Sequence, residues 1–192
     1  MVVLYGLGFI DTEKFELIPL NIIPPNLYIW TILTAPFYHN PHQYIHLLVN
    51  VMVIYYVTPA LEKKWGTYEY LNFVFTVNGL TALYSLLILL LIFACTGKVT
   101  ILATSVSSFL GCSVALLFAY QHLYPEKEWT FKDTFSFKAK HLPWMVLFVC
   151  SSLSILLEHS FAILTVSSGG IGIGWFYLRH FQYLPQHPLN KV

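Results

Sequence analysis

Long apolar stretches, separated by short clusters of charged and polar residues, run along most of the chain. A helix needs about 20 mostly apolar residues to cross a bilayer, so each stretch predicts a membrane-spanning helix. The pattern therefore predicts an all-α, polytopic membrane helix bundle. Its five predicted helices cover roughly residues 44–61, 70–95, 101–120, 142–157 and 161–178.

Residues 1–10 are also apolar but suffice for only about half a crossing. They lack the basic start and the cleavage site of a signal peptide. We interpret them as the end of a sixth helix whose beginning is absent from this chain, although a short re-entrant segment would give the same pattern. Since no repeat or second domain is visible, residues 1–192 are expected to form one domain.

Hydrophobic residues make up 57% of the chain and charged residues 10%, whereas soluble domains carry about 25% charged residues. This composition excludes an ordinary soluble domain and makes the lipid bilayer the expected environment. A net charge of +1 gives no basic patch, so nucleic acid is excluded as a partner. The three cysteines are too scattered for a metal site, and neither a metal nor another cofactor is expected.

Lysine and arginine gather in alternate loops of the predicted bundle. Eight of the ten follow the helices predicted at 44–61, 101–120 and 161–178, and only Lys14 and Lys98 fall on the opposite side. Basic residues of short loops stay in the cytoplasm. The pattern predicts a multi-pass protein with a cytoplasmic C-terminus.

His46 and Asn50 are polar residues in an otherwise apolar stretch. Four residues apart, they share one helix face, which must point toward protein or water and not toward lipid. We expect His46 to bond a loop carbonyl. We expect Asn50 to bond across to the helix predicted at 101–120, near Ser107.

Small residues mark two further helices. Gly170 and Gly174 lie one turn apart, the spacing at which membrane helices can bring their backbones close. Close helix packing, or contact with a partner helix, is the role we predict for these glycines together with Gly111 and Gly169.

Glu62, Trp65 and Gly66 end the helix predicted at 44–61. Glu62 belongs either to a solvated interface cluster with Lys63 and Lys64 or to a buried contact with backbone amides of the following turn. The second alternative would hold the two helices on either side of the turn together, and helix packing is the role that we predict for Glu62, Trp65 and Gly66.

The order of these elements resembles a rhomboid: His-x-x-x-Asn opens one helix, Leu-Glu-x-x-Trp-Gly closes it, a serine motif lies two helices later and the last helix is rich in glycine. The resemblance implies a six-helix rhomboid-like fold. It also puts the nucleophile position of rhomboid proteases at Ser107, the oxyanion pair at His46 and Asn50, and the histidine base at the position of Ser167.

This chain departs from the protease pattern at several of those positions. Ser167 has no acid–base equilibrium near neutral pH and cannot act as the base. Ser105 and Ser108 replace the glycines of the serine motif. His159 would lie about 12 Å along a helix from Ser167, and the loop residues His39 and His42 would reach inward only by refolding the loop. We therefore expect no catalytic residues, with an active protease that uses Ser107 and an unusual base as the alternative.

A non-catalytic branch is more similar. The segments 24–31, 61–66, 109–111 and 175–179 together resemble the transmembrane protein 115 family, and the likeness extends from about Val3 to Gln182. The resemblance implies a rhomboid-like Golgi membrane protein that supports Golgi-to-endoplasmic-reticulum retrograde transport. It also implies membrane proteins or a Golgi tethering complex as partners, and self-association. A transporter is disfavoured because the predicted helices contain almost no ionisable residues away from their ends.

Overall fold

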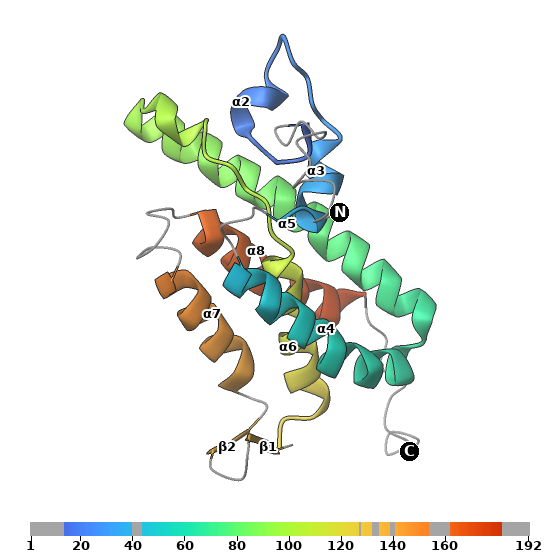
Figure 1. The fold of residues 1–192 in the computed structure, drawn as a ribbon. Coiled ribbons are helices and arrows are strands. Elements are labelled where there is room, and N and C mark those ends of the chain that lie inside the picture. The colour runs from blue at the N-terminus through green and yellow to red at the C-terminus, as the bar shows by residue number, and fades with distance from the viewer. Residues whose placement is uncertain are drawn as a thin grey trace, which may run out of the picture.

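The predicted helix bundle is confirmed by the computed structural model, which describes residues 14–39, 44–126, 128–131, 135–138, 141–153 and 162–181 (Figure 1). The segment 1–10, predicted as the end of a helix, lies outside the described residues. The main helices are α4 (Tyr44–Trp65), α5 (Thr67–Thr96), α6 (Leu110–Leu123), α7 (Leu142–Leu153) and α8 (Ala162–His180).

Helices α4 and α5 are, among the described residues, the two that are long and apolar enough to span a bilayer. A sharp turn joins them at Gly66, whose φ of +84° is a conformation that favours glycine. The 30 residues of α5 extend about 45 Å, which exceeds the hydrocarbon thickness of about 30 Å. In Figure 1, α5 accordingly crosses the bundle obliquely.

The helix predicted to begin at residue 101 begins instead at Leu110. Residues 99–101 form the short 3-10 helix η3 (Val99–Ile101), and Val106 pairs in an antiparallel bridge with Leu17, far away in the sequence. This pairing provides hydrogen bonds for the backbone N–H and C=O groups of Val106, so the segment does not need to be helical there. The remaining α6 has 14 residues, ten of them buried, and is the central helix of the bundle.

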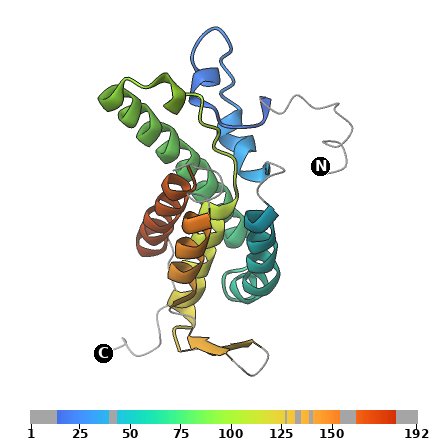
Figure 2. The same ribbon diagram turned by 60° about the vertical axis from the view of Figure 1, so that its left-hand side comes forward.

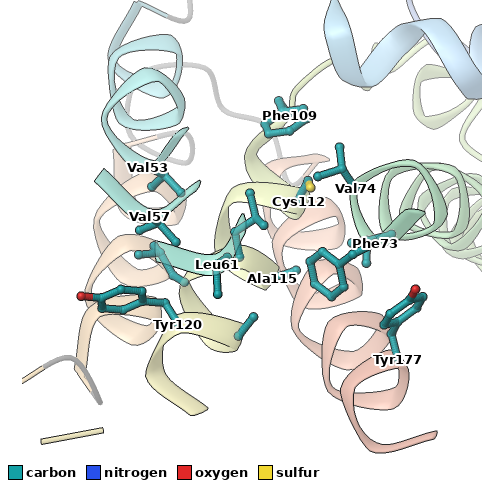
Figure 3. Close-up of a cluster of buried hydrophobic side chains, with 14 residues drawn as sticks. Val53, Val57, Leu61, Phe73, Val74, Phe109, Cys112, Ala115, Tyr120 and Tyr177 are labelled. Carbon is teal, nitrogen blue, oxygen red and sulfur yellow. The ribbon is translucent and has the colours of Figure 1, made fainter. Parts of the chain in front are cut away.

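The core lies around α6. Figure 3 shows side chains from α4, α5, α6 and α8 meeting in one cluster. Those labelled are Val53, Val57, Leu61, Phe73, Val74, Phe109, Cys112, Ala115, Tyr120 and Tyr177.

Two smaller features lie at opposite ends of the bundle (Figures 1 and 2). At one end, the N-terminal loop (residues 14–39) carries α2 (Pro19–Ile22), α3 (Thr31–Thr34) and the 3-10 helix η2 (Ala35–Phe37), and packs against α5. At the other, β1 (Glu128–Phe131) and β2 (Phe135–Lys138) form an antiparallel hairpin. The sequence predicted only a charged loop there, although alternating aromatic and polar residues are typical of such short strands.

Candidate functional site

The serine motif lies outside the helix, in a non-helical segment that we call the serine segment (residues 102–109). The N-terminal loop holds this segment by main-chain hydrogen bonds. Val106 N donates to Leu17 O over 2.9 Å, Leu17 N donates to Val106 O over 3.3 Å, and Leu20 N donates to Leu102 O over 3.0 Å. The serines are therefore covered by a loop that is distant from them in the sequence.

A buried carboxylate reinforces this pairing. Ser105 Oγ donates to Glu16 Oε2 over 2.6 Å, and Glu16 is only 8% exposed. Buried carboxylates need such donors because an unpaired charge is costly to bury. Glu16 was not predicted as a site residue, although an acidic residue followed by an apolar run is visible in the sequence.

Ser107, the nucleophile position of the rhomboid resemblance, is 4% exposed and lies just before α6. Among the described residues, no hydrogen bond joins its hydroxyl to a histidine. Ser108 has a structural bond, since its Oγ accepts from the backbone N of Leu110 over 3.0 Å at the start of α6. Ser108 thus satisfies one of the free amides at the helix start.

Asn50 bonds across to α6 as predicted, but its partner is Ser113 and not Ser107. Ser113 Oγ donates to Asn50 Oδ1 over 2.8 Å. The difference follows from the late start of α6, which puts Ser113 on its first turn, level with Asn50. The amide nitrogen of Asn50 lies 2.7 Å from His39 Nε2. His39 was expected to reach inward only if the loop refolded, and this is wrong, because the N-terminal loop as it stands brings His39 to Asn50 of α4.

His46 is 3% exposed, and its Nε2 donates to the carbonyl oxygen of Cys150 over 3.4 Å. Cys150 belongs to α7, so the expected loop carbonyl is in fact a helix carbonyl. His46 and Asn50 do share one buried face of α4. This face connects α4 to α7 through His46 and to α6 through Asn50.

Ser167, at the base position of the resemblance, is fully buried within α8. Its Oγ donates to the carbonyl oxygen of Ile163, one turn earlier, over 2.7 Å. The hydroxyl proton of Ser167 is thereby used within its own helix. Among the described residues, no group of three or more metal-ligating side chains lies together.

Helices α6 and α8 pack at very short range through glycines. A Cβ added to Gly170 would lie 2.6 Å from the carbonyl carbon of Gly111, and one added to Gly174 would lie 2.8 Å from the Cβ of Ala115. A Cβ at Gly169 would similarly meet the ring of Tyr84, at 2.6 Å from its Cδ1. Each of these three positions admits only a hydrogen in place of a side chain, and together they fix the contact of α8 with α6 and α5.

The turn between α4 and α5 is held by Glu62, Trp65 and Gly66. Glu62 Oε1 accepts from Thr67 Oγ1 over 2.7 Å, while the main-chain Gly66 N donates to Glu62 O over 2.8 Å. The Trp65 ring packs edge-on against Phe73, 5.3 Å between centroids. The Glu62 carboxylate therefore bonds a side-chain hydroxyl of the turn and not the backbone amides of the second predicted alternative.

A neighbouring polar cluster was not anticipated from the sequence. Tyr177 OH donates to Glu69 Oε1 over 3.0 Å and accepts from Asn72 Nδ2 over 3.1 Å. Since Glu69 and Asn72 belong to α5 and Tyr177 to α8, the cluster joins these two helices. Glu69, Asn72 and Tyr177 meet only because α5 packs against α8, and the sequence alone did not predict this packing.

Comparisons with known proteins agree with the membrane architecture. Over residues 1–190 the chain matches the model of a family described as eukaryotic integral membrane protein (DUF1751). It is 27% identical over 174 residues to rhomboid-like protein 19 of Arabidopsis thaliana, an alignment that covers 91% of this chain and 55% of that protein. The chain thus spans about half the length of this curated relative. Its match along nearly the whole sequence shows that it belongs to the DUF1751 family of eukaryotic integral membrane proteins.

Proposed function

We propose that this chain is a non-catalytic, rhomboid-like protein of the Golgi membrane. It recognises membrane partners and supports Golgi-to-endoplasmic-reticulum retrograde transport. The observation that best supports the absence of catalysis is the hydrogen bond that Ser167 donates to Ile163. At the position where a protease needs a base, a serine hydroxyl donates within its own helix. A serine nucleophile without a base is a poor one at neutral pH.

The other vestigial positions support the same proposal. The Asn50 side chain is hydrogen-bonded to Ser113 and to His39, and His46 donates a hydrogen bond to a main-chain carbonyl of α7. A group that stabilises an oxyanion must have its donor directed at the reacting oxygen. In this chain these donors instead join helices and the N-terminal loop, which is a structural use of the same residues.

Recognition of transmembrane segments, or of a Golgi tethering complex, is the binding function that we propose. The rhomboid-like relative and the integral membrane family support a scaffold within the bilayer. Exposed apolar side chains such as Leu48 of α4 and Phe148 of α7, 60% and 72% exposed, offer surfaces to lipid or to a partner helix. Self-association through such surfaces, with the C-terminus in the cytoplasm, is part of the proposal.

A protease remains the second candidate because of one observation, the buried carboxylate of Glu16 beside the serine segment. A carboxylate can act as a general base when one of its oxygens lies within hydrogen-bond reach of the nucleophile. Glu16 contacts Ser105 and not Ser107, so this alternative would move the nucleophile by two residues.

The non-catalytic and the protease functions can be distinguished by restoring the protein or its serine variants to cells that lack it. We expect slowed retrograde transport of a reporter cargo in these cells, and equal rescue by the natural protein, Ser107→Ala and Ser105→Ala. Failure of either alanine variant, at normal abundance, would favour the protease. Normal transport and glycan processing without the protein would contradict the proposed role.

A further inference from the structure

A small cavity of about 10 Å³, enough for about one water molecule, lies between the N-terminal loop, α5 and the serine segment. Ala35 and Pro36 line it from the loop, Asn78 and Thr81 from α5, and Ser108 from the serine segment. It therefore lies directly beneath the part of the loop that carries η2.

Two residues that line the cavity each carry a buried polar atom with unused hydrogen-bonding capacity. Asn78 Nδ2 and Thr81 Oγ1 are buried and have no hydrogen-bond partner among the described residues, and the two residues are only 5% and 4% exposed. The thiol of Cys112 beside Asn78 is a weak acceptor and does not replace a hydrogen bond. Because unpaired buried polar groups are costly, these atoms are suited to bind an acceptor brought from outside.

The loop that closes this cavity is fixed at its end by His39, three residues after Pro36. His39 Nε2 bonds the amide of Asn50, while Phe37 packs its ring against Phe75 and Phe109 at 6.1 and 6.0 Å between centroids. The aromatic contacts do not depend on charge. The His39 bond is therefore the part of this attachment that a proton can change.

The bonding of Asn50 determines which form of His39 fits. Asn50 Oδ1 accepts from Ser113, so the amide NH₂ faces His39, and His39 Nε2 must be the acceptor. Only the neutral ring has an acceptor nitrogen. A protonated ring would bring N–H against N–H and break the bond.

We infer that His39 is a proton-sensitive latch, which in its neutral form holds the loop over the cavity and on protonation releases it, giving a partner access to Asn78 and Thr81. The ligand that fits these two donors is a carbonyl or hydroxyl oxygen of a partner's transmembrane helix. The identity of the ligand rests on the proposed function, whereas the latch itself does not.

The electrostatic surroundings set the direction of the response. Burial, followed by the nearby His46, lowers the pKa of His39 below its ordinary value of 6.5. From the other packed elements, α6 presents the uncharged Ser113, and α7 presents the main-chain carbonyl of Cys150 to His46. The latch is therefore closed at neutral pH and opens as the pH falls below about 6.5.

Cysteine labelling of the purified full chain tests the latch without any partner. Ala35→Cys places a reporter on the cavity wall in a Cys95→Ser background, since Cys95 is exposed whereas Cys112 and Cys150 are buried. The labelling rate with a maleimide is measured at about pH 7.5 and about pH 5, on either side of an ordinary histidine pKa. The same background without Ala35→Cys corrects for the remaining cysteines.

The decisive quantity is the labelling rate divided by that of the same reporter in His39→Gln, because this ratio cancels the effect of pH on the thiol. The glutamine side chain of that variant would stay neutral and retain an acceptor oxygen. We expect a ratio near one at the higher pH and a rise of about fivefold at the lower, the factor given by loss of one ordinary hydrogen bond. His42→Gln should leave the rise unchanged. A ratio that stays the same at both pH values would overturn the latch, whether or not the protein later proves to bind partners.

Discussion

Two polar regions of this protein use similar residues in different ways. The loop end comprises the N-terminal loop and the serine segment. Glu16 bonds these two non-helical segments to each other, and His39 bonds the loop to Asn50 of α4. The turn end comprises residues 62–73 with Tyr177, and its bonds join helix to helix. Next to the loop end, α5 carries the buried polar atoms of Asn78 and Thr81, which have no hydrogen-bond partner among the described residues. The comparison indicates that the turn end holds the bundle together, whereas the loop end can change without unfolding it.

The glycine contact between α6 and α8 connects the two ends and should be the most sensitive to substitution. Gly170→Ala forces a Cβ into the main chain of Gly111, and overpacking of this kind costs about 3 kcal/mol. Thermal unfolding in detergent measures the loss. Gly172→Ala is the matched control, since nothing lies within 4 Å of a Cβ there. The packing account fails if the two variants lose equal stability.

Asn50→Leu should have the next largest effect, because it leaves Ser113 and His39 without their partner. We expect a loss of about 2 to 3 kcal/mol of unfolding free energy. A double-mutant cycle with Ser113→Ala should show a coupling of about 1 kcal/mol. Strictly additive losses would mean that the bond across α4 and α6 contributes nothing.

At the turn end, Tyr177→Phe removes the hydroxyl that bonds Glu69 and Asn72. Because both partners lie on a neighbouring helix, unfolding of the whole bundle should become easier by about 1 to 1.5 kcal/mol. Tyr68→Phe is the control, since Tyr68 is 84% exposed. If Tyr177→Phe altered only local hydrogen exchange, the turn end would not hold the bundle as we infer.

At the loop end, Ser105→Ala should act locally. It removes the bond to Glu16, so the paired amides of Leu17 and Val106 should exchange about fivefold faster, as expected for loss of one hydrogen bond. If the loop end opens locally before the bundle unfolds, the free energy of global unfolding should change by much less than that of Tyr177→Phe. A global loss equal to that of Tyr177→Phe would abolish the distinction between the two ends.

The smallest expected effect is the pH dependence of the loop end. The pKa of His39 is lowered in the folded protein, so the unfolded loop binds the proton more readily and stability rises with pH. Protection of the loop amides should therefore fall as the pH drops through about 6.5, relative to His39→Gln at the same pH. A parallel decline in both proteins would exclude His39 as the titrating group.

The apolar stretches predicted the helix bundle, and they placed the starts of α4 and α7 at the correct residues. They could not locate the start of α6, because it depends on the pairing of Val106 with Leu17, about 90 residues away. The helix-face argument put His46 and Asn50 inside the protein but could not name Ser113 or Cys150. Glycine spacing is visible in the sequence, yet the partner of Gly170 is set only by how α8 crosses α6. The polar cluster of Glu69, Asn72 and Tyr177 corresponds to no local sequence pattern, because Tyr177 lies more than 100 residues after the other two.

The central claim is that Ser107 belongs to a non-catalytic scaffold. A fluorophosphonate or isocoumarin probe, applied to the detergent-solubilised natural protein and to Ser107→Ala, tests it most directly, with an active rhomboid protease as positive control. We expect no labelling of either form while the control reacts. Labelling of the natural protein that disappears in Ser107→Ala would show an activated serine and contradict the account.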